Sequence, residues 1–428
     1  MDAREVVLDV LLDIEQNNTF SNIALQKALK KNQFEDKKLR AFVTRMCEGI
    51  TEKRITLDYI INQYSKTKIK KCKPMIRSIL RMGCYQIHFM DGVPEHAAVS
   101  ESVKLTKKHG FSGLTGYVNG VLRSIAREKE HVTYPDLNKD KIAYASVYYS
   151  MPEWLVKKIY ADYPEQALAI LKGCFAERLT TVRVNLCKTD RETIKKQMQE
   201  AGIEVFDGLY DEAALRIGQY DFIRRVPGYK SGEFTVQDES SMCAVRAAHI
   251  KPGNIVMDIC AAPGGKTTAA AEYLNGEGMV YSMDVSEDKL SLIQENVERL
   301  GFSNVKISAH DATMPFDIEQ ADVVIADVPC SGLGIIGRKN DIKYRLTEEG
   351  FENLVTLQKK ILKNVSDYVA PGGTLLYSTC TINPTENEEN VQWFLKEHTE
   401  YKLEESRLFL PGVDACDGFY YAILKRNK

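Results

Sequence analysis

Two cysteines stand where a reactive thiol would be useful. Cys330 lies in the segment DVPCSG and Cys380 in the segment STCT, and each follows a short apolar run that is typical of a buried strand. Most isolated cysteines are packing residues. These two differ, because a thiol beyond a strand and beside Pro, Ser or Thr can be exposed and can have a lowered pKa. Both are therefore candidate nucleophiles.

One reaction that needs such a thiol is methylation at carbon 5 of cytosine. That carbon is a poor nucleophile, so a thiolate must first add to carbon 6 and turn the ring into an enamine that attacks an activated methyl group. The thiolate later leaves as the carbon-5 proton is lost. Because a stacked base cannot present carbon 6, the target must be single-stranded or flipped out of its helix.

A turn rich in small residues marks a candidate cofactor site. The segment DICAAPGGKT ends a strand at residues 255–260 and opens a helix, whose unpaired N–H groups could bind a carboxylate or phosphate. A P-loop would need glycine at Cys260, five residues before Gly265, and a G-x-G-x-x-G motif is also absent. Asp284 ends the next strand, where its carboxylate could accept both ribose hydroxyls. The pattern favours a nucleoside cofactor.

Two further aspartates follow strands of the same series. Asp311 comes after the third strand, where it could meet an adenine edge, and Asp327 closes the fourth. Either one alone would more often cap a helix or lie in a solvated turn. A methyltransferase that acts on an amino group would place a tetrapeptide such as Asn-Pro-Pro-aromatic after the fourth strand, whereas this chain has a thiol there.

The elements that must position these residues are short strands alternating with helices. The apolar runs cover residues 255–260, 279–284, 305–309, 322–327 and 374–379. This alternation predicts an α/β domain with a doubly wound, mostly parallel sheet, and such sheets bind ligands at the carboxyl ends of their strands. In the methyltransferase order of this fold the fourth and fifth strands are neighbours, so we expect both sulfurs near one crevice.

The front of the chain has a different character. From residue 3 to about 128 the apolar residues recur at helical spacing, and residues 1–130 hold 23 Lys+Arg against 15 Asp+Glu. The segment KTKIKKCKPMIRSILR is the most basic, and Pro74 within it could start a helix. An excess of eight positive charges suggests contact with a polyanion, although a solvated helical surface would have the same composition.

These observations divide the chain into four parts. We predict a helical domain at residues 1–130, an irregular polar linker at 131–150, a small α+β subdomain at 151–233 and the α/β domain at 234–428.

The motifs resemble the signatures of the Sun/Fmu (RsmB-like) family of 16S ribosomal RNA cytosine-5 methyltransferases. DICAAPGGKT, DVPCSGLG and STCT followed by NPTENEENV carry the resemblance, and the closing DGFYYAILKR resembles that family's last strand. Residues 3–127 resemble the NusB-like RNA-binding domain of the bacterial member. The resemblance implies a Rossmann-like class I methyltransferase domain that uses S-adenosylmethionine. One departure is Asn340, where family members commonly have proline.

The resemblance also implies a role for each candidate residue. It makes Cys380 the nucleophile, Cys330 the residue that assists product release, and Asp327 the contact to N3 of the target base. It places the cofactor contacts at Cys260, Ala261, Ala262, Pro263, Gly264, Gly265, Lys266, Asp284, Asp311 and Asp327.

The remaining expectations concern partners and location. We expect 16S ribosomal RNA as free or early-assembly RNA, with remote contacts from the basic helical domain and from Arg338, Lys339 and Lys343. We expect a cytoplasmic monomer that binds neither a metal nor a membrane. The alternatives are a non-catalytic RNA-binding assembly or antitermination factor, a cytosine-5 methyltransferase of another RNA, and a DNA cytosine-5 methyltransferase, which would have no need of Cys380.

Overall fold

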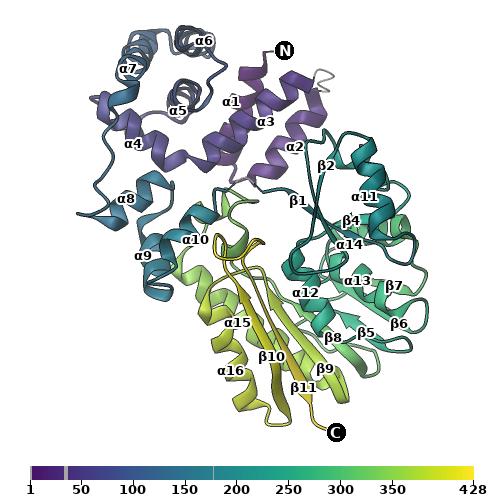
Figure 1. Cartoon of the computed structure of the whole chain (residues 1–428). Helices are drawn as coiled ribbons and strands as arrows, with labels where there is room; N and C mark the ends of the chain where they lie inside the picture. The colour runs from purple at the N-terminus through teal and green to yellow at the C-terminus, as the bar shows by residue number, and fades with distance from the viewer. Residues whose placement is uncertain (1, 33–36, 177) are drawn as a thin grey trace. The chain divides into compact units, whose positions relative to one another are not determined.

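The computed structural model describes residues 2–32, 37–176 and 178–428, and the chain forms two compact units (Figure 1). The first unit comprises Met1–Leu171 together with Ile336–Arg345. The second comprises Lys172–Ile335 and Leu346–Lys428. A ten-residue segment from the middle of the predicted α/β domain thus belongs to the helical unit, which the sequence did not indicate.

The first unit is built from helices, as predicted for residues 1–130, but it also includes a helix at residues 153–162, which lies in the range predicted for the α+β subdomain. The helices are α1 (Ala3–Gln16), α2 (Ser21–Asn32), α3 (Lys37–Glu52), α4 (Arg54–Tyr64), α5 (Pro74–Phe89), α6 (Glu95–Lys108), α7 (Thr115–Arg127), α8 (Lys141–Tyr148) and α9 (Glu153–Asp162). Pro74 is the first residue of α5, where its missing N–H costs no hydrogen bond. Val7, Ile60, Ile79 and Leu122 from four of these helices are fully buried in one apolar core.

The prediction of an irregular linker at 131–150 is wrong for its second half. Residues 141–148 form α8, and the Asp140 side chain accepts hydrogen bonds from the N–H groups of Ile142 and Ala143 at its start. Four tyrosines pack beside or within this helix: Tyr134, Tyr144, Tyr148 and Tyr149. A helix this short shows too little periodicity to stand out in the sequence.

The second unit begins with the small α+β part. Helix α10 (Ala167–Gly173) spans the boundary at Leu171 and Lys172, and it is followed by β1 (Thr180–Val184), α11 (Arg191–Glu200), β2 (Glu204–Asp207), β3 (Ala214–Gly218) and β4 (Phe234–Val236). The strands pair antiparallel in the order β2-β3-β1-β4. Val182, Ile194, Leu215 and Phe234 form its buried core with α11 on one face.

The larger sheet carries the candidate site. Its elements are α12 (Glu239–Ala247), β5 (Ile255–Asp258), α13 (Gly265–Leu274), β6 (Met279–Asp284), α14 (Glu287–Leu300), β7 (Val305–Ala309), β8 (Ala321–Asp327), α15 (Glu348–Val365), β9 (Val369–Thr379), α16 (Glu388–Glu397), β10 (Tyr401–Phe409) and β11 (Phe419–Arg426). The strand order is β10-β11-β9-β8-β5-β6-β7. Strands β5 to β9 pair in parallel, whereas β10 and β11 are antiparallel.

Successive residues of the strands pack against different helices, as expected for a sheet covered on both faces. Val256 and Val323 lie in the core with α12 and α13, whereas Met257 and Val324 lie in the core with α15 and α16. The fourth and fifth parallel strands of the sequence, β8 and β9, are neighbours, with Asp327 paired in register with Ser378. The predicted adjacency of these two strands, from which we expected Cys330 and Cys380 to lie close together, is therefore confirmed.

Candidate active site

The turn after β5 is shaped for a small ligand. Gly264 has φ +98°, and a Cβ there would lie 3.3 Å from the Cα of Ile293, so a side chain would be strained and crowded. Helix α13 starts at the next residue, and the N–H groups of its first turn have no partner within the helix. Together these features leave a backbone surface that can bind the carboxylate end of a ligand.

Asp258 supports this turn from beneath. It is fully buried and accepts a hydrogen bond from the hydroxyl of Thr267 at 2.6 Å, while its other oxygen has no hydrogen-bond partner among the described residues. Burial raises the pKa of Asp258 to about 7, despite the hydrogen bond from Thr267. Asp258 therefore stabilises the turn through its hydrogen bond with Thr267, and its burial keeps it from direct contact with a ligand.

Asp284 at the end of β6 lies against the same turn. It is 4% exposed, and its two oxygens accept hydrogen bonds from the N–H groups of Ala262 at 3.1 Å and of Val285 at 2.8 Å. Lys289 lies 3.0 Å from the carboxylate. A nearly buried, charge-balanced carboxylate with remaining lone pairs suits the two hydroxyls of a ribose.

Asp311 is placed differently from the other aspartates. It is exposed, and one oxygen accepts hydrogen bonds from the backbone N–H and the hydroxyl of Thr313, at 2.9 and 2.8 Å. These bonds lower the pKa of Asp311. The backbone just before it is tied to the cofactor side of the sheet, because the N–H of His310 donates to the carbonyl of Asp284.

The two cysteines meet beyond β8 and β9. Their sulfur atoms lie 3.1 Å apart, and both residues are half-buried. The hydrogen bond with the Cys380 thiol, followed by burial, raises the pKa of Cys330 well above its ordinary value. The lowered pKa that the sequence made possible is therefore wrong for Cys330, because its thiol forms its hydrogen bond with another thiol and is buried.

A buried polar network fixes the loop that carries Cys330. The hydroxyls of Ser331 and Thr381 lie 2.7 Å apart and join the two cysteine segments. The Ser331 N–H donates to the fully buried carboxylate of Glu386 at 2.9 Å. Gln358 of α15 donates to the same carboxylate and to the Pro329 carbonyl, both at 2.9 Å. Neither Glu386 nor Gln358 was singled out in the sequence; Glu386 lies in NPTENEENV, and that motif was the available signal.

Asp327 connects this network with the cofactor turn. Its Oδ2 accepts a hydrogen bond from the Lys266 ammonium at 2.6 Å, and its Oδ1 accepts one from the hydroxyl of Ser378 at 2.8 Å. Lys266 is nearly buried and also lies 4.9 Å from the ring centroid of Phe419. The structure thus brings Asp327, Lys266 and the two cysteines to the carboxyl ends of neighbouring strands.

Some of the basic residues that we expected to contact RNA are buried or form ion pairs within the protein. Lys343 is fully buried in the first unit and donates to the carbonyl of Glu52 at 2.8 Å, so it is not available to RNA. Arg77 and Arg81 of the basic segment form ion pairs with Glu15, and Arg81 also pairs with Asp58. The lysines of that segment are exposed: Lys66, Lys68, Lys70, Lys71 and Lys73.

Two findings concern other kinds of site. In the described ranges there is no cluster of three or more His, Cys, Asp or Glu side chains that could hold a metal ion. None of the helices in the part of the chain that the structure covers is long and apolar enough to cross a membrane.

The sheet, together with the comparisons that follow, identifies the chain as an S-adenosyl-L-methionine-dependent rRNA methyltransferase. The model of the 16S rRNA methyltransferase RsmB/F family matches residues 246–425, that of the NusB family residues 1–127, and that of an RsmF/B-like ferredoxin-like domain residues 151–221. The chain belongs to the RsmB/F family.

Individual proteins agree with this assignment. The chain is 35% identical to the probable ribosomal RNA small subunit methyltransferase B of Bacillus subtilis, over 99% of both proteins. It is 31% identical to ribosomal RNA small subunit methyltransferase B of Pectobacterium atrosepticum, over 91% of both. The crystal structure of PH0851 is similar over 100% of this chain and 99% of that one, with a TM-score of 0.83 and 26% identity.

Replacing Asp284 by alanine is expected to weaken cofactor binding by about 1.5–3 kcal/mol, because a charged acceptor for the ribose hydroxyls is lost. This corresponds to roughly 10- to 150-fold in Kd. Isothermal titration with S-adenosyl-L-methionine measures it. Asp288→Ala is the matched control, since Asp288 is an exposed carboxylate at the start of α14. Equal dissociation constants for both variants and the unsubstituted protein would show that Asp284 does not bind the cofactor.

Proposed function

We propose that the protein methylates carbon 5 of a specific cytosine in 16S ribosomal RNA, with Cys380 as the covalent nucleophile and Cys330 as the residue that assists release. The observation that carries this proposal is the pair of sulfur atoms 3.1 Å apart, beside Asp327 and the cofactor turn. Membership in the RsmB/F family and the NusB match support the RNA substrate. An enzyme that methylates an amino group has no use for a thiol pair at this place.

The proposed reaction forms and later breaks one covalent bond between the enzyme and the base, from the Cys380 sulfur to carbon 6. The Cys380 thiolate adds to carbon 6, and the electron pair displaced from the 5,6 double bond makes carbon 5 nucleophilic. Bound S-adenosyl-L-methionine supplies an electrophilic methyl group. After carbon 5 has been methylated, its proton passes to water and the C–H bonding pair re-forms the 5,6 double bond. The sulfur leaves carbon 6 with the C–S bonding pair, which restores the aromatic ring and the free thiolate.

The environment of Cys330 supports Cys380 as the nucleophile and Cys330 as the residue that assists release. Its raised pKa keeps the proton on Cys330 at neutral pH, and a protonated Cys330 can donate a hydrogen bond to the Cys380 sulfur. Such a bond stabilises negative charge on Cys380 before the attack and again as the sulfur leaves. Asp327 is the last residue of β8, three residues before Cys330, and is the group proposed to contact N3 of the base.

The cofactor-binding residues are part of the same proposal. The first turn of α13 and the segment Cys260–Lys266 would hold the amino-acid end, Asp284 the ribose, and Asp311 the adenine edge. Each lies at the carboxyl end of a parallel strand, where ligands of such sheets bind.

A product analysis tests the proposed function. The protein is incubated with methyl-labelled S-adenosyl-L-methionine and, in separate reactions, with unmodified 16S ribosomal RNA or with DNA, and labelled nucleosides are identified after digestion. We expect 5-methylcytidine from the RNA alone. Label in DNA, label in another nucleoside, or RNA binding without transfer would each refute the proposal and would point to one of the alternatives.

Glu386→Gln is expected to lower kcat by about tenfold or more. One carboxylate oxygen accepts from the Ser331 N–H and the Gln358 amide and the other accepts from the Asn383 amide, so an amide nitrogen at either position leaves a buried donor unpaired. Since Glu386 acts through the Cys330 loop, cofactor affinity should stay within about twofold. Single-turnover rates and isothermal titration measure the two effects. Glu389→Gln, an exposed carboxylate in the same segment, is the control. A kcat unchanged in a folded Glu386→Gln protein would show that Glu386 does not position the loop.

A further inference from the structure

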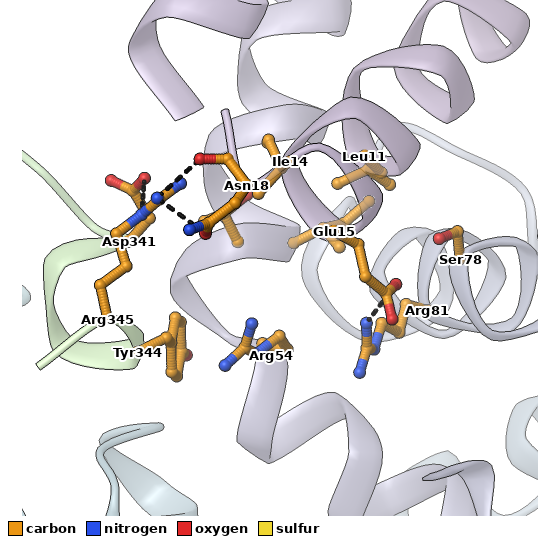
Figure 2. A pocket seen from close by; sticks show the side chains of 12 residues that line it. Leu11, Ile14, Glu15, Asn18, Arg54, Ser78, Arg81, Asp341, Tyr344 and Arg345 are labelled. Carbon is orange, nitrogen blue, oxygen red and sulfur yellow. Dashed lines mark hydrogen bonds and ion pairs between the residues drawn. The ribbon is translucent and has the colours of Figure 1, made fainter. Parts of the chain in front are cut away.

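The first unit contains a cavity of about 140 Å³ that the proposed reaction does not use (Figure 2). Its apolar side is formed by Leu11, Ile14 and Ile50, from α1 and α3. Its polar side carries arginines and carboxylates from α1, α4, α5 and the segment Ile336–Arg345. The cavity is complete only when this segment is in place.

Arg54 is the unusual member of the lining. Its guanidinium carbon lies 3.7 Å from the ring centroid of Tyr344, and Figure 2 shows it between that ring and Arg81. Among the residues described, no carboxylate or other acceptor pairs with it. Burial lowers the pKa of Arg54, and Arg81 adds to this effect, whereas Tyr344 and the charges of Asp58 and Glu15 oppose it. A half-buried cation beside a second cation is an arrangement that a bound anion stabilises.

The other charged groups of the lining are already paired. Arg81 holds both oxygens of Asp58 at 2.7 Å, and Glu15 is shared by Arg77 and Arg81. Asp341 accepts hydrogen bonds from Arg345 at 3.1 Å and from the N–H of Ser21 at 3.0 Å. The lining itself has Arg54, Arg81 and Arg345 against Glu15 and Asp341. Arg77 and Asp58 pair with these groups from outside the lining, so the positive charge left over is that of Arg54.

We propose that this cavity is a subsite for one phosphate group of the RNA backbone, with the Arg54 guanidinium as its principal ligand. This inference rests on the proposed RNA substrate. A planar guanidinium presents paired donors that match phosphate oxygens, and stacking on Tyr344 fixes its plane before the ligand arrives. The Ser78 hydroxyl lines the same cavity and supplies a further donor. The exposed lysines between α4 and α5, in the same unit, are suited to neighbouring phosphates.

Inorganic phosphate is the first probe. Thermal unfolding is followed with increasing phosphate at constant ionic strength, with chloride as the balancing anion, in the unsubstituted protein, Arg54→Gln and Arg123→Gln. Arg123 is an exposed arginine on α7 outside the cavity and serves as the matched control. We expect phosphate to raise Tm in the unsubstituted protein and in Arg123→Gln but not in Arg54→Gln. No phosphate-specific rise, or the same rise in Arg54→Gln, would overturn the subsite.

RNA binding is the second probe and distinguishes the source of the phosphate. The Kd for a 16S ribosomal RNA fragment is measured across a series of salt concentrations. Loss of one phosphate contact should weaken binding by about tenfold in Arg54→Gln and reduce the slope of log Kd against log salt by roughly 0.7. Arg54→Lys, which keeps the charge but not the planar fork, should fall between. A phosphate effect on Tm with unchanged RNA affinity would assign the cavity to a free anion and overturn its role in RNA binding.

The two probes also separate this inference from the proposed function. Arg54 forms no ion pair with the described residues, so Arg54→Gln should melt near the unsubstituted protein when phosphate is absent. If it does not fold, Arg54→Lys carries the same comparison, with a weaker phosphate effect as the expected result. Failure of methyl transfer in the unsubstituted protein would refute the proposed function, whereas the phosphate response of Tm would still decide whether the anion site exists.

Discussion

Cys380→Ala is expected to abolish methylation of 16S ribosomal RNA, with a loss of roughly 10⁴-fold or more in the single-turnover rate. Without a sulfur to add to carbon 6, carbon 5 stays an aromatic carbon that does not attack a methyl group. The loss should be confined to the chemical step, because no cofactor contact is assigned to Cys380. Transfer of label from S-adenosyl-L-methionine to RNA measures the rate.

The control for Cys380→Ala is Cys187→Ala. Cys187 is an exposed thiol of the second unit whose sulfur contacts Glu272 and Asn275 at the end of α13, and its removal should leave the rate unchanged. Titration with S-adenosyl-L-methionine should give the same Kd for both variants and the unsubstituted protein. A Cys380→Ala protein that binds cofactor normally and still transfers methyl groups at more than about a hundredth of the full rate would exclude Cys380 as the nucleophile.

Cys330→Ala is expected to stop the reaction at a different point and to leave the protein covalently attached to RNA. Attack by Cys380 can proceed without a second thiol, whereas departure of the sulfur would lose the hydrogen bond that we propose Cys330 donates across the 3.1 Å between the two sulfur atoms. The adduct should survive denaturation, appear as a slower band on a denaturing gel, and disappear after ribonuclease treatment.

The double variant Cys330→Ala/Cys380→Ala separates this result from tight binding. It should form no band, because the attacking sulfur is gone. If Cys330→Ala gave neither adduct nor product while Cys380→Ala stayed active, the two cysteines would have the opposite roles. An adduct formed by Cys380→Ala alone would lead to the same reversal.

Much of the larger sheet followed from the sequence. The predicted runs at 279–284 and 305–309 coincide with β6 and β7, because each is a short apolar segment between a turn and a helix. The proximity of Cys330 to Cys380 could also be predicted, since the order of strands in this fold places β8 beside β9. Site features set by strand order and by the ends of strands were therefore predictable.

Site features that depend on residues far away in the sequence could not be predicted. The direction of the Cys330 pKa shift depends on a thiol 50 residues away, and the role of Glu386 depends on Ser331 and Gln358 meeting it in the core. Lys343 resembles a surface cation in the sequence, but its ammonium reaches a carbonyl 291 residues away in the chain. Local patterns of polarity contain no information about such contacts.

The segment Ile336–Arg345 has a consequence for the order in which the protein can fold during synthesis. Arg345 donates hydrogen bonds to the carbonyls of Asn18 and Thr19, and Tyr344 donates to that of Glu52, yet both residues are made long after the helices they contact. When α1 to α9 emerge from the ribosome, Arg54 lacks the ring of Tyr344, and the cavity beside it stays open until residue 345 of 428 has been added. The helical unit is the first to begin folding, but it can be completed only after most of the methyltransferase domain has been translated.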